Sequence, residues 1–134
     1  MKVFFDTNVL LDIALAREPY AKASIEAWTI VAKSDEKPLI APHSLATFSY
    51  IVGQAHGRQM AKRSVNDLLE TGRVATFDDA CAHHAHALGF SDFEDAMVAA
   101  AAVGSEANCI LTRNLADFKR APLLCQTPEV FLST

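Results

Sequence analysis

The stretch VFFDTNVLLD (residues 3–12) places an aspartate, Asp6, directly behind three apolar residues. A threonine, an asparagine and a second apolar run follow it. The first apolar run predicts a buried strand and the second predicts a helix. Two explanations of Asp6 are open at this point. It caps the helix, because Asp, Thr and Asn all favour that place, or it is a carboxylate delivered to the rim of a sheet for chemistry.

The length and composition predict a single domain over residues 1–134. The chain can enclose a sizeable core, since 51% of its 134 residues are hydrophobic and no Pro-, Gly- or Ser-rich linker divides it. No leader-like segment precedes the first strand, and no apolar run reaches the roughly 18–20 residues that cross a bilayer, so we expect no membrane association. Three scattered cysteines predict reduced thiols and a cytoplasmic location.

The formal net charge of -4 bears on the possible partners. Proteins that bind nucleic acid by charge alone are usually basic, so the composition argues against a simple nucleic-acid clamp. It does not exclude an enzyme whose bound cations supply local positive charge.

Short apolar runs alternate with helix-length patterned stretches. Strands are expected at residues 2–5, 38–41, 73–77, 109–112 and 122–126. Helices are expected at 8–16, 19–34, 44–57, 59–72, 78–89, 91–107 and 127–132, with Ser44, Asp78, Ser91 and Thr127 as caps. This order predicts the α/β class, as a three-layer α/β/α sandwich with a central parallel sheet of four to five short strands.

Polar residues follow two of the expected strands. In parallel α/β sheets, ligands bind beyond the carboxyl ends of the strands. Asp6 follows the first strand, and Arg113, Asn114 and Asp117 follow the strand at 109–112. Both groups therefore belong at the same edge of the sheet.

A third polar group opens the helix at 91–107. Asp92 and Asp95 are three residues apart, so their side chains share a helix face. SDFE (91–94) fits a capping box of Ser91 and Glu94, which gives Glu94 a structural role and leaves Asp92 open between charge at the cap and a ligand. Asp95 precedes small apolar residues, where a carboxylate is costly unless it is paired or bound to a metal.

Asp6, Asp95 and Asp117 thus come from three segments that the topology can bring together, with Asp92 as an auxiliary acid. Carboxylates at one site repel each other, and Mg²⁺ or Mn²⁺ relieves that repulsion. Such a site can activate water against a phosphodiester.

Three motifs together resemble a PIN domain, a metal-dependent ribonuclease fold that includes the toxins of the VapBC toxin–antitoxin class. They are VFFDTNVLLDIAL (3–15), FSDFEDAMVAAAA (90–102) and ILTRNLADF (110–118), with LIAPHSLATFSYI (39–51) and TPEVFL (127–132) in the expected order. The resemblance implies that Asp6, Asp95 and Asp117 hold Mg²⁺ or Mn²⁺. It also implies an RNA substrate, a small antitoxin as a partner, and a homodimer.

The same resemblance makes Asn8, Thr112 and Asn114 supporting polar residues. Arg113, with Lys119 and Arg120, is a candidate contact for RNA phosphates beside the metal, the alternative being solvated surface.

The sequence departs from the usual family pattern at one position. The second acid, a glutamate on the helix after the second strand, falls at about Thr47, and no acid lies between Pro38 and Lys62. The resemblance is to a PIN subgroup with the same ending and no glutamate there. Three explanations of the missing glutamate are open: Asp92 compensates for it, the affinity for metal is lower, or the site is inactive. A catalytically weak or inactive module that binds RNA or protein is therefore the second hypothesis.

A third hypothesis is a phosphotransferase, because DTN after a strand resembles the aspartate nucleophile of haloacid-dehalogenase-like phosphatases. Those enzymes need a second aspartate two residues later, where this chain has Asn8.

We expect Asp12 to form a salt bridge or face solvent. We expect His83, His84 and His86 to form a solvated helix face rather than a zinc site.

Overall fold

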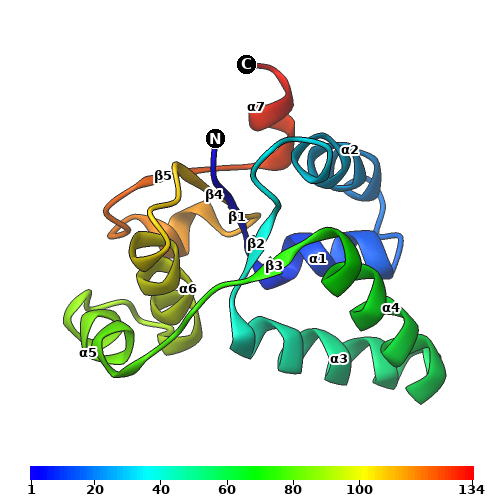
Figure 1. Cartoon of the computed structure of the whole chain (residues 1–134), viewed down its shortest axis with the longest axis horizontal. Coiled ribbons are helices and arrows are strands. Elements are labelled where there is room, and N and C mark those ends of the chain that lie inside the picture. The colour runs from blue at the N-terminus through cyan, green and yellow to red at the C-terminus, as the bar shows by residue number, and fades with distance from the viewer.

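The computed structural model describes all residues from 1 to 134 and has one sheet with helices on both faces (Figure 1). The strands are β1 (Val3–Phe5), β2 (Leu39–Ile40), β3 (Arg73–Val74), β4 (Cys109–Leu111) and β5 (Leu124–Gln126). The α-helices are α1 (Thr7–Ala14), α2 (Ala21–Ala32), α3 (Pro42–His56), α4 (Arg58–Thr71), α5 (Asp79–Ala87), α6 (Phe93–Gly104) and α7 (Pro128–Leu132). A short 3₁₀ helix, η1 (Leu115–Phe118), follows β4 and was not expected from the sequence.

The sheet has the strand order β3-β2-β1-β4-β5, and every neighbouring pair is parallel. Phe5 in β1 pairs with Leu111 in β4. The residues that follow them, Asp6 and Thr112, therefore lie at the same carboxyl edge in the middle of the sheet. This arrangement places Asp6 beside the segment Thr112–Asn114, as expected.

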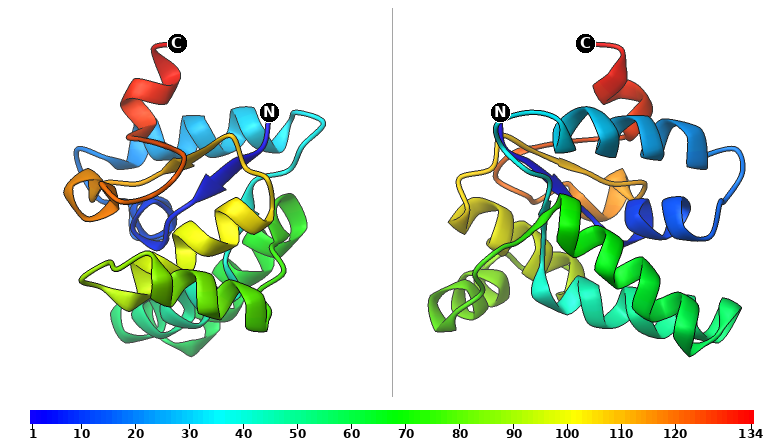
Figure 2. Two further views of the ribbon diagram at one scale, coloured as in Figure 1. Left: turned by 90° about the vertical axis from the view of Figure 1, so that its left-hand side faces the viewer. Right: turned by 45° about the vertical axis from the view of Figure 1, so that its right-hand side comes forward.

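Alternate residues of β1 face two separate cores. Val3 and Phe5 pack with residues of α1, α2, α3 and α4, whereas Phe4 packs with residues of α6 and with Phe118 of η1. α7 adds Phe131 to the first core, and α5 packs against the outer side of α6 through Ala85. Figure 2 shows the resulting layers in two further orientations. The predicted three-layer α/β/α sandwich with five parallel strands is confirmed.

Helix α6 lies close to the sheet because the side chains on its inner face are small. Val98, Ala99, Ala101 and Ala102 are almost completely buried. The chain runs from α6 into β4, so α6 is antiparallel to the strands and begins at their carboxyl edge. The acidic first turn of α6 is thereby brought to the edge that carries Asp6.

Two helices have N-terminal caps other than those predicted. Helix α3 begins at Pro42, whose fixed φ suits a first helical position, so Ser44 is not its cap. Ser44 is instead buried, and its hydroxyl accepts a hydrogen bond from Thr7 Oγ1 over 2.8 Å. Helix α6 is capped by Asp92 rather than Ser91, so the expected capping box is wrong. The caps Asp78 and Thr127 are confirmed, since both accept backbone N–H groups.

The cysteines Cys81, Cys109 and Cys125 are all free thiols. Among the helices, none combines the length and the apolar character that crossing a bilayer requires.

Candidate active site

Asp6 is both a helix cap and a carboxylate at the sheet edge, so neither explanation from the sequence excluded the other. Only 3% of the residue is exposed. Its side chain accepts the backbone N–H of Thr7 over 2.8 Å and the hydroxyl of Thr112 over 2.7 Å. Burial raises the pKa of Asp6, against hydrogen bonds from Thr112 and Thr7 that lower it.

The first turn of α6 is organised by Asp92. Its Oδ1 accepts the backbone N–H groups of Glu94 and Asp95, over 2.8 Å and 3.2 Å. This cap leaves the second oxygen of Asp92 and the carboxylate of Glu94 free of hydrogen bonds within the protein. The turn therefore presents three carboxylates at the sheet edge.

Asp95 is half-buried beside several negative charges. Burial is the largest cause that raises its pKa to about 7, followed by the charges of Asp6, Asp92, Asp117 and Glu94. A carboxyl group that is partly protonated near neutral pH, in a polar cleft, is a candidate for a functional group.

Most of the predicted site residues line two hollows, and residues at the start of α6 contribute to both. The first, of about 160 Å³, is lined by Asp6, Thr7, Asn8, Leu11, His43, Glu94, Asp95, Val98 and Asn114. The second, of about 230 Å³, is lined by Gly89, Phe90, Ser91, Asp92, Ala116, Asp117, Lys119 and Arg120. The structure thus brings Asp6, Asn8, Asp95 and Asn114 together and places Asp92 and Asp117 in the adjoining hollow.

The donor chemistry of this edge fits a hard divalent cation. Carboxylate and amide oxygens are the ligands that Mg²⁺ and Mn²⁺ prefer. A cation would also relieve the repulsion among carboxylates that, after burial, raises the pKa of Asp95. As the side chains stand, no three Asp, Glu, His or Cys side chains converge on one point. Among the predicted metal ligands, Asp6 and Asp95 line one hollow, whereas Asp92 and Asp117 line the other.

The sequence matches the family model described as PIN domain, PIN_3, over residues 2–116. The chain belongs to the PIN-domain family. PIN domains are nucleases that generally depend on divalent metal ions. No curated protein matches the sequence at a significant level.

Solved structures share the fold of this PIN domain. A VapBC2 structure from Rickettsia felis, bound to a DNA fragment from its promoter, has a TM-score of 0.77 at 19% identity, covering 95% of this chain and 98% of that chain. VapC20 of Mycobacterium tuberculosis, a sarcin–ricin-loop-cleaving toxin, has a TM-score of 0.73 at 15% identity, covering 92% and 97%. A toxin–antitoxin complex from Klebsiella pneumoniae has a TM-score of 0.72 at 23% identity, covering 95% and 98%.

Arg113, a candidate contact for RNA, lines neither of the two acidic hollows, and its guanidinium binds other residues of the PIN domain. Its Nε donates to Asp12 over 2.9 Å, its Nη1 to Glu129, and its Nη2 to Ser24 Oγ over 3.0 Å. The guanidinium also lies 4.5 Å from the centre of the Tyr20 ring. Of the two alternatives expected for Asp12, the structure shows the salt bridge and not exposure to solvent, since only 2% of the residue is exposed.

Lys119 and Arg120 remain the exposed cations at the second hollow. Arg120 Nη1 donates to the carbonyl of Gly89 over 3.2 Å, which holds its head at the rim. The histidines at 83–86 behave as expected of a solvated face, with His83 exposed and 3.5 Å from Asp79.

Two residues of the first hollow were missed by the sequence analysis. Glu94 was assigned to a capping box, and that role is taken by Asp92. His43 follows the end of β2, the strand beside β1, and this position was the signal that could have found it. Its Nε2 lies 3.2 Å from the carbonyl oxygen of Glu94, and burial lowers the pKa of the ring.

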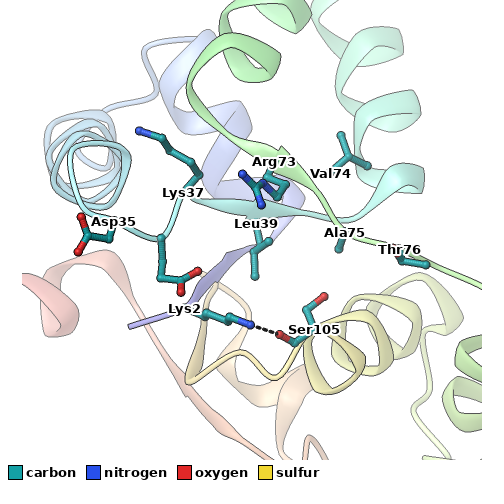
Figure 3. Close-up of a pocket in the computed structure, with 10 residues that line it drawn as sticks. Lys2, Asp35, Lys37, Leu39, Arg73, Val74, Ala75, Thr76 and Ser105 are labelled. Atoms are coloured by element: carbon teal, nitrogen blue, oxygen red, sulfur yellow. Dashed lines mark hydrogen bonds between the residues drawn. The ribbon is translucent and has the colours of Figure 1, made fainter.

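A further polar hollow, of about 220 Å³, lies at the opposite, amino edge of the sheet (Figure 3). Its lining includes residues that precede or begin strands, namely Lys2, Lys37 and Arg73. Lys2 Nζ donates to the carbonyl of Ser105 over 3.4 Å, and Lys37 Nζ donates to that of Ala32 over 2.8 Å. These lysines stabilise helix ends, and the two acids of this hollow, Asp35 and Glu36, are exposed, unlike the buried Asp6 at the carboxyl edge.

Proposed function

We propose that residues 1–134 form a single-domain endoribonuclease that depends on Mg²⁺ or Mn²⁺ and hydrolyses phosphodiester bonds of RNA. The observation that carries this proposal is the pairing of buried Asp6 with Asp95 in one hollow, where burial and neighbouring charges raise the pKa of Asp95 to about 7. Membership of the PIN-domain family supports a nuclease.

Asp6, Asp95 and Asp117 would hold the metal, and Asp92 would assist through the oxygen that does not cap α6. A bound Mg²⁺ or Mn²⁺ would supply an activated water and neutralise charge on the phosphodiester. Thr112 keeps the Asp6 carboxylate oriented through its 2.7 Å hydrogen bond.

The amide and cationic side chains of the site would position the RNA. Asn8 Oδ1 accepts the backbone N–H of Arg113 over 3.2 Å, which holds the Asn8 amide at the wall of the first hollow. Asn114 is exposed on the same wall. Lys119 and Arg120 lie at the second hollow, where a phosphate on either side of the cleaved bond can reach them.

The decisive experiment compares Asp95→Asn with the wild-type protein on structured and unstructured RNA, in Mn²⁺ and in EDTA. We expect the wild type to cleave only with metal, and Asp95→Asn to remain folded and inactive. Asp67→Asn, at an exposed position on α4, is the matched control and should cleave normally. Cleavage by Asp95→Asn at the wild-type rate would overturn the assignment.

We further propose that the chain is a cytoplasmic toxin that forms a homodimer and is inhibited by a small antitoxin. The similar structures from Rickettsia felis and Klebsiella pneumoniae are toxin–antitoxin complexes, and this supports an antitoxin as the partner. A small reading frame directly beside the gene, whose product co-purifies with this chain and suppresses cleavage, is the expected finding. Sedimentation of the purified chain as a monomer would exclude the homodimer.

A binding module without turnover is the second candidate function. It is favoured by the absence of any acid on α3 and by the lack of three converging ligands. Thermal unfolding separates the two candidates, because a metal site in the native state must raise stability with free metal. No shift at millimolar Mn²⁺, together with RNA binding that is insensitive to EDTA, would establish the binding module.

A further inference from the structure

His43 is the residue of α3 that reaches the first hollow. It lies in the first turn of that helix, and its ring lines the hollow together with Asp6 and Asp95. Thr47, one helical turn further on, lines neither of the two acidic hollows. The contribution of α3 to the site therefore comes from a histidine and not from a side chain at the position of the family's second acid.

The hydrogen bond of His43 defines which ring nitrogen carries the hydrogen. Nε2 lies 3.2 Å from the backbone carbonyl oxygen of Glu94, and a carbonyl only accepts, so Nε2 is the donor. Nδ1 is buried and has no hydrogen-bond partner. The ring also stands edge-on to Phe77, with the ring centres 6.2 Å apart. The ring is thus oriented by packing, with a single polar contact to α6.

The bonded carbonyl belongs to the peptide group that links Glu94 to Asp95. The other end of that group, the N–H of Asp95, donates to Asp92 Oδ1 over 3.2 Å. Because a peptide group is planar, bonds at both of its ends restrict its rotation and thereby fix the Cα of Asp95. One bond comes from the cap of α6 itself, and the other comes from a residue 51 positions away.

We propose that His43 is a positioning residue for Asp95. Its Nε2–H holds the peptide group before Asp95, so that the Asp95 carboxylate faces Asp6 across the first hollow. Helix α3 thereby contributes a hydrogen bond to the site in place of a carboxylate. This inference rests on the proposed metal-dependent function. It gives α3 a role in the site although this helix lacks the family's second acid.

The test measures the apparent affinity for Mn²⁺ from the rise in the thermal unfolding midpoint, in parallel with RNA cleavage. His43→Gln keeps an N–H donor near the place of Nε2, whereas His43→Asn places its amide near Nδ1, and His43→Phe keeps only the ring. We expect His43→Phe and His43→Asn to weaken Mn²⁺ binding about tenfold, as for other residues that orient ligands, and His43→Gln to restore it. His56→Phe, at the exposed end of α3, is the matched control and should bind as the wild type.

Equal Mn²⁺ affinity in His43→Phe and the wild type would overturn the inference, as would a His43→Gln variant as weak as His43→Phe. If His43→Phe does not fold, the comparison of the two amides decides, because only the longer one can reach the Glu94 carbonyl. A wild type that neither binds Mn²⁺ nor cleaves RNA overturns the proposed function and this inference with it. A wild type that does both, with His43 variants indistinguishable from it, overturns only the role of His43.

Discussion

The hydroxyl of Thr112 donates to the carboxylate of Asp6 over 2.7 Å, and the two residues directly follow the adjacent strands β4 and β1. Both are almost fully buried. The same hydroxyl oxygen accepts the backbone N–H of Asn114 over 3.0 Å. One threonine therefore joins the central carboxylate of the site to the loop that carries Asn114 and Asp117.

Replacing Thr112 with valine should destabilise the protein and disturb the site together. The substitution leaves a buried carboxylate without one donor, which costs about 1.5–3 kcal/mol of unfolding free energy for a hydrogen bond to a charged group. Urea unfolding at pH 7 in EDTA measures the cost, and Mn²⁺ titration measures the loss of metal binding. Thr112→Ser keeps the hydroxyl and should retain most of the stability and most of the Mn²⁺ binding. Equal behaviour of the valine and serine variants would contradict the role of the hydroxyl in holding Asp6.

The Arg113–Asp12 pair should contribute to stability rather than to RNA binding. Arg113→Met leaves the Asp12 carboxylate, with 3% of its side chain exposed, without a cationic partner. Breaking a buried ion pair costs about 3–5 kcal/mol, and removing both charges in Asp12→Leu/Arg113→Met should recover much of that. Urea unfolding measures both, with the exposed Arg17→Met as the control. An Arg113→Met protein of normal stability and reduced RNA affinity would show that the role in RNA binding was the correct one.

The stability of the metal-free protein should fall between about pH 4 and pH 7. The pKa of Asp95 is raised from its usual 3.8 to about 7, so the folded state holds this proton when the unfolded chain has released it. Stability is therefore greatest at the acidic end of this window and is lost as the pH rises through it. In EDTA at pH 8, Asp95→Asn should melt a few degrees above the wild type, and the difference should shrink at pH 5. A variant that melts lower at pH 8 would exclude charge repulsion at this site.

The cap of α6 gives a test that is independent of the metal. Asp92→Ala removes the acceptor for two backbone N–H groups and should cost about 1 kcal/mol of unfolding free energy, whereas Ser91→Ala should cost less than about 0.5 kcal/mol. The comparison is made in EDTA at pH 5, where Asp95 is protonated and its repulsion with Asp92 is weak. A larger loss of unfolding free energy in Ser91→Ala than in Asp92→Ala would support the capping box expected from the sequence.

Much of the fold was predictable because buried helix and strand faces require apolar residues at regular spacings in the sequence. The apolar run at 109–112 indicated β4, and the alanines after Asp95 indicated a helix packed closely on the sheet. Helix starts were predicted less well, since several consecutive residues could cap the same helix. At α6 both Ser91 and Asp92 are good caps, and the backbone geometry selects Asp92.

The candidate site was predictable only in part. Asp6 and Asp95 were identified because each is an acid next to buried structure. A carboxylate there costs free energy unless it is paired or bound to a metal. Arg113 was a candidate contact for RNA because it lies with Lys119 and Arg120 near the presumed site, and its side chain binds Asp12, 101 residues away. His43 was overlooked because a single histidine has no distinctive sequence pattern, and only its position after β2 indicated this edge of the sheet.

The sequence by itself determined the order of strands and helices, the parallel sheet and the edge at which its acids gather. These follow from hydrophobic periodicity and from the direction of strands joined by helices, both of which are local or topological. Only the tertiary structure decided which polar side chains meet: Thr112 with Asp6, Arg113 with Asp12, and His43 with the peptide group before Asp95. Such contacts depend on side-chain direction and on a few ångströms of separation between distant segments, and packing of the two cores sets both.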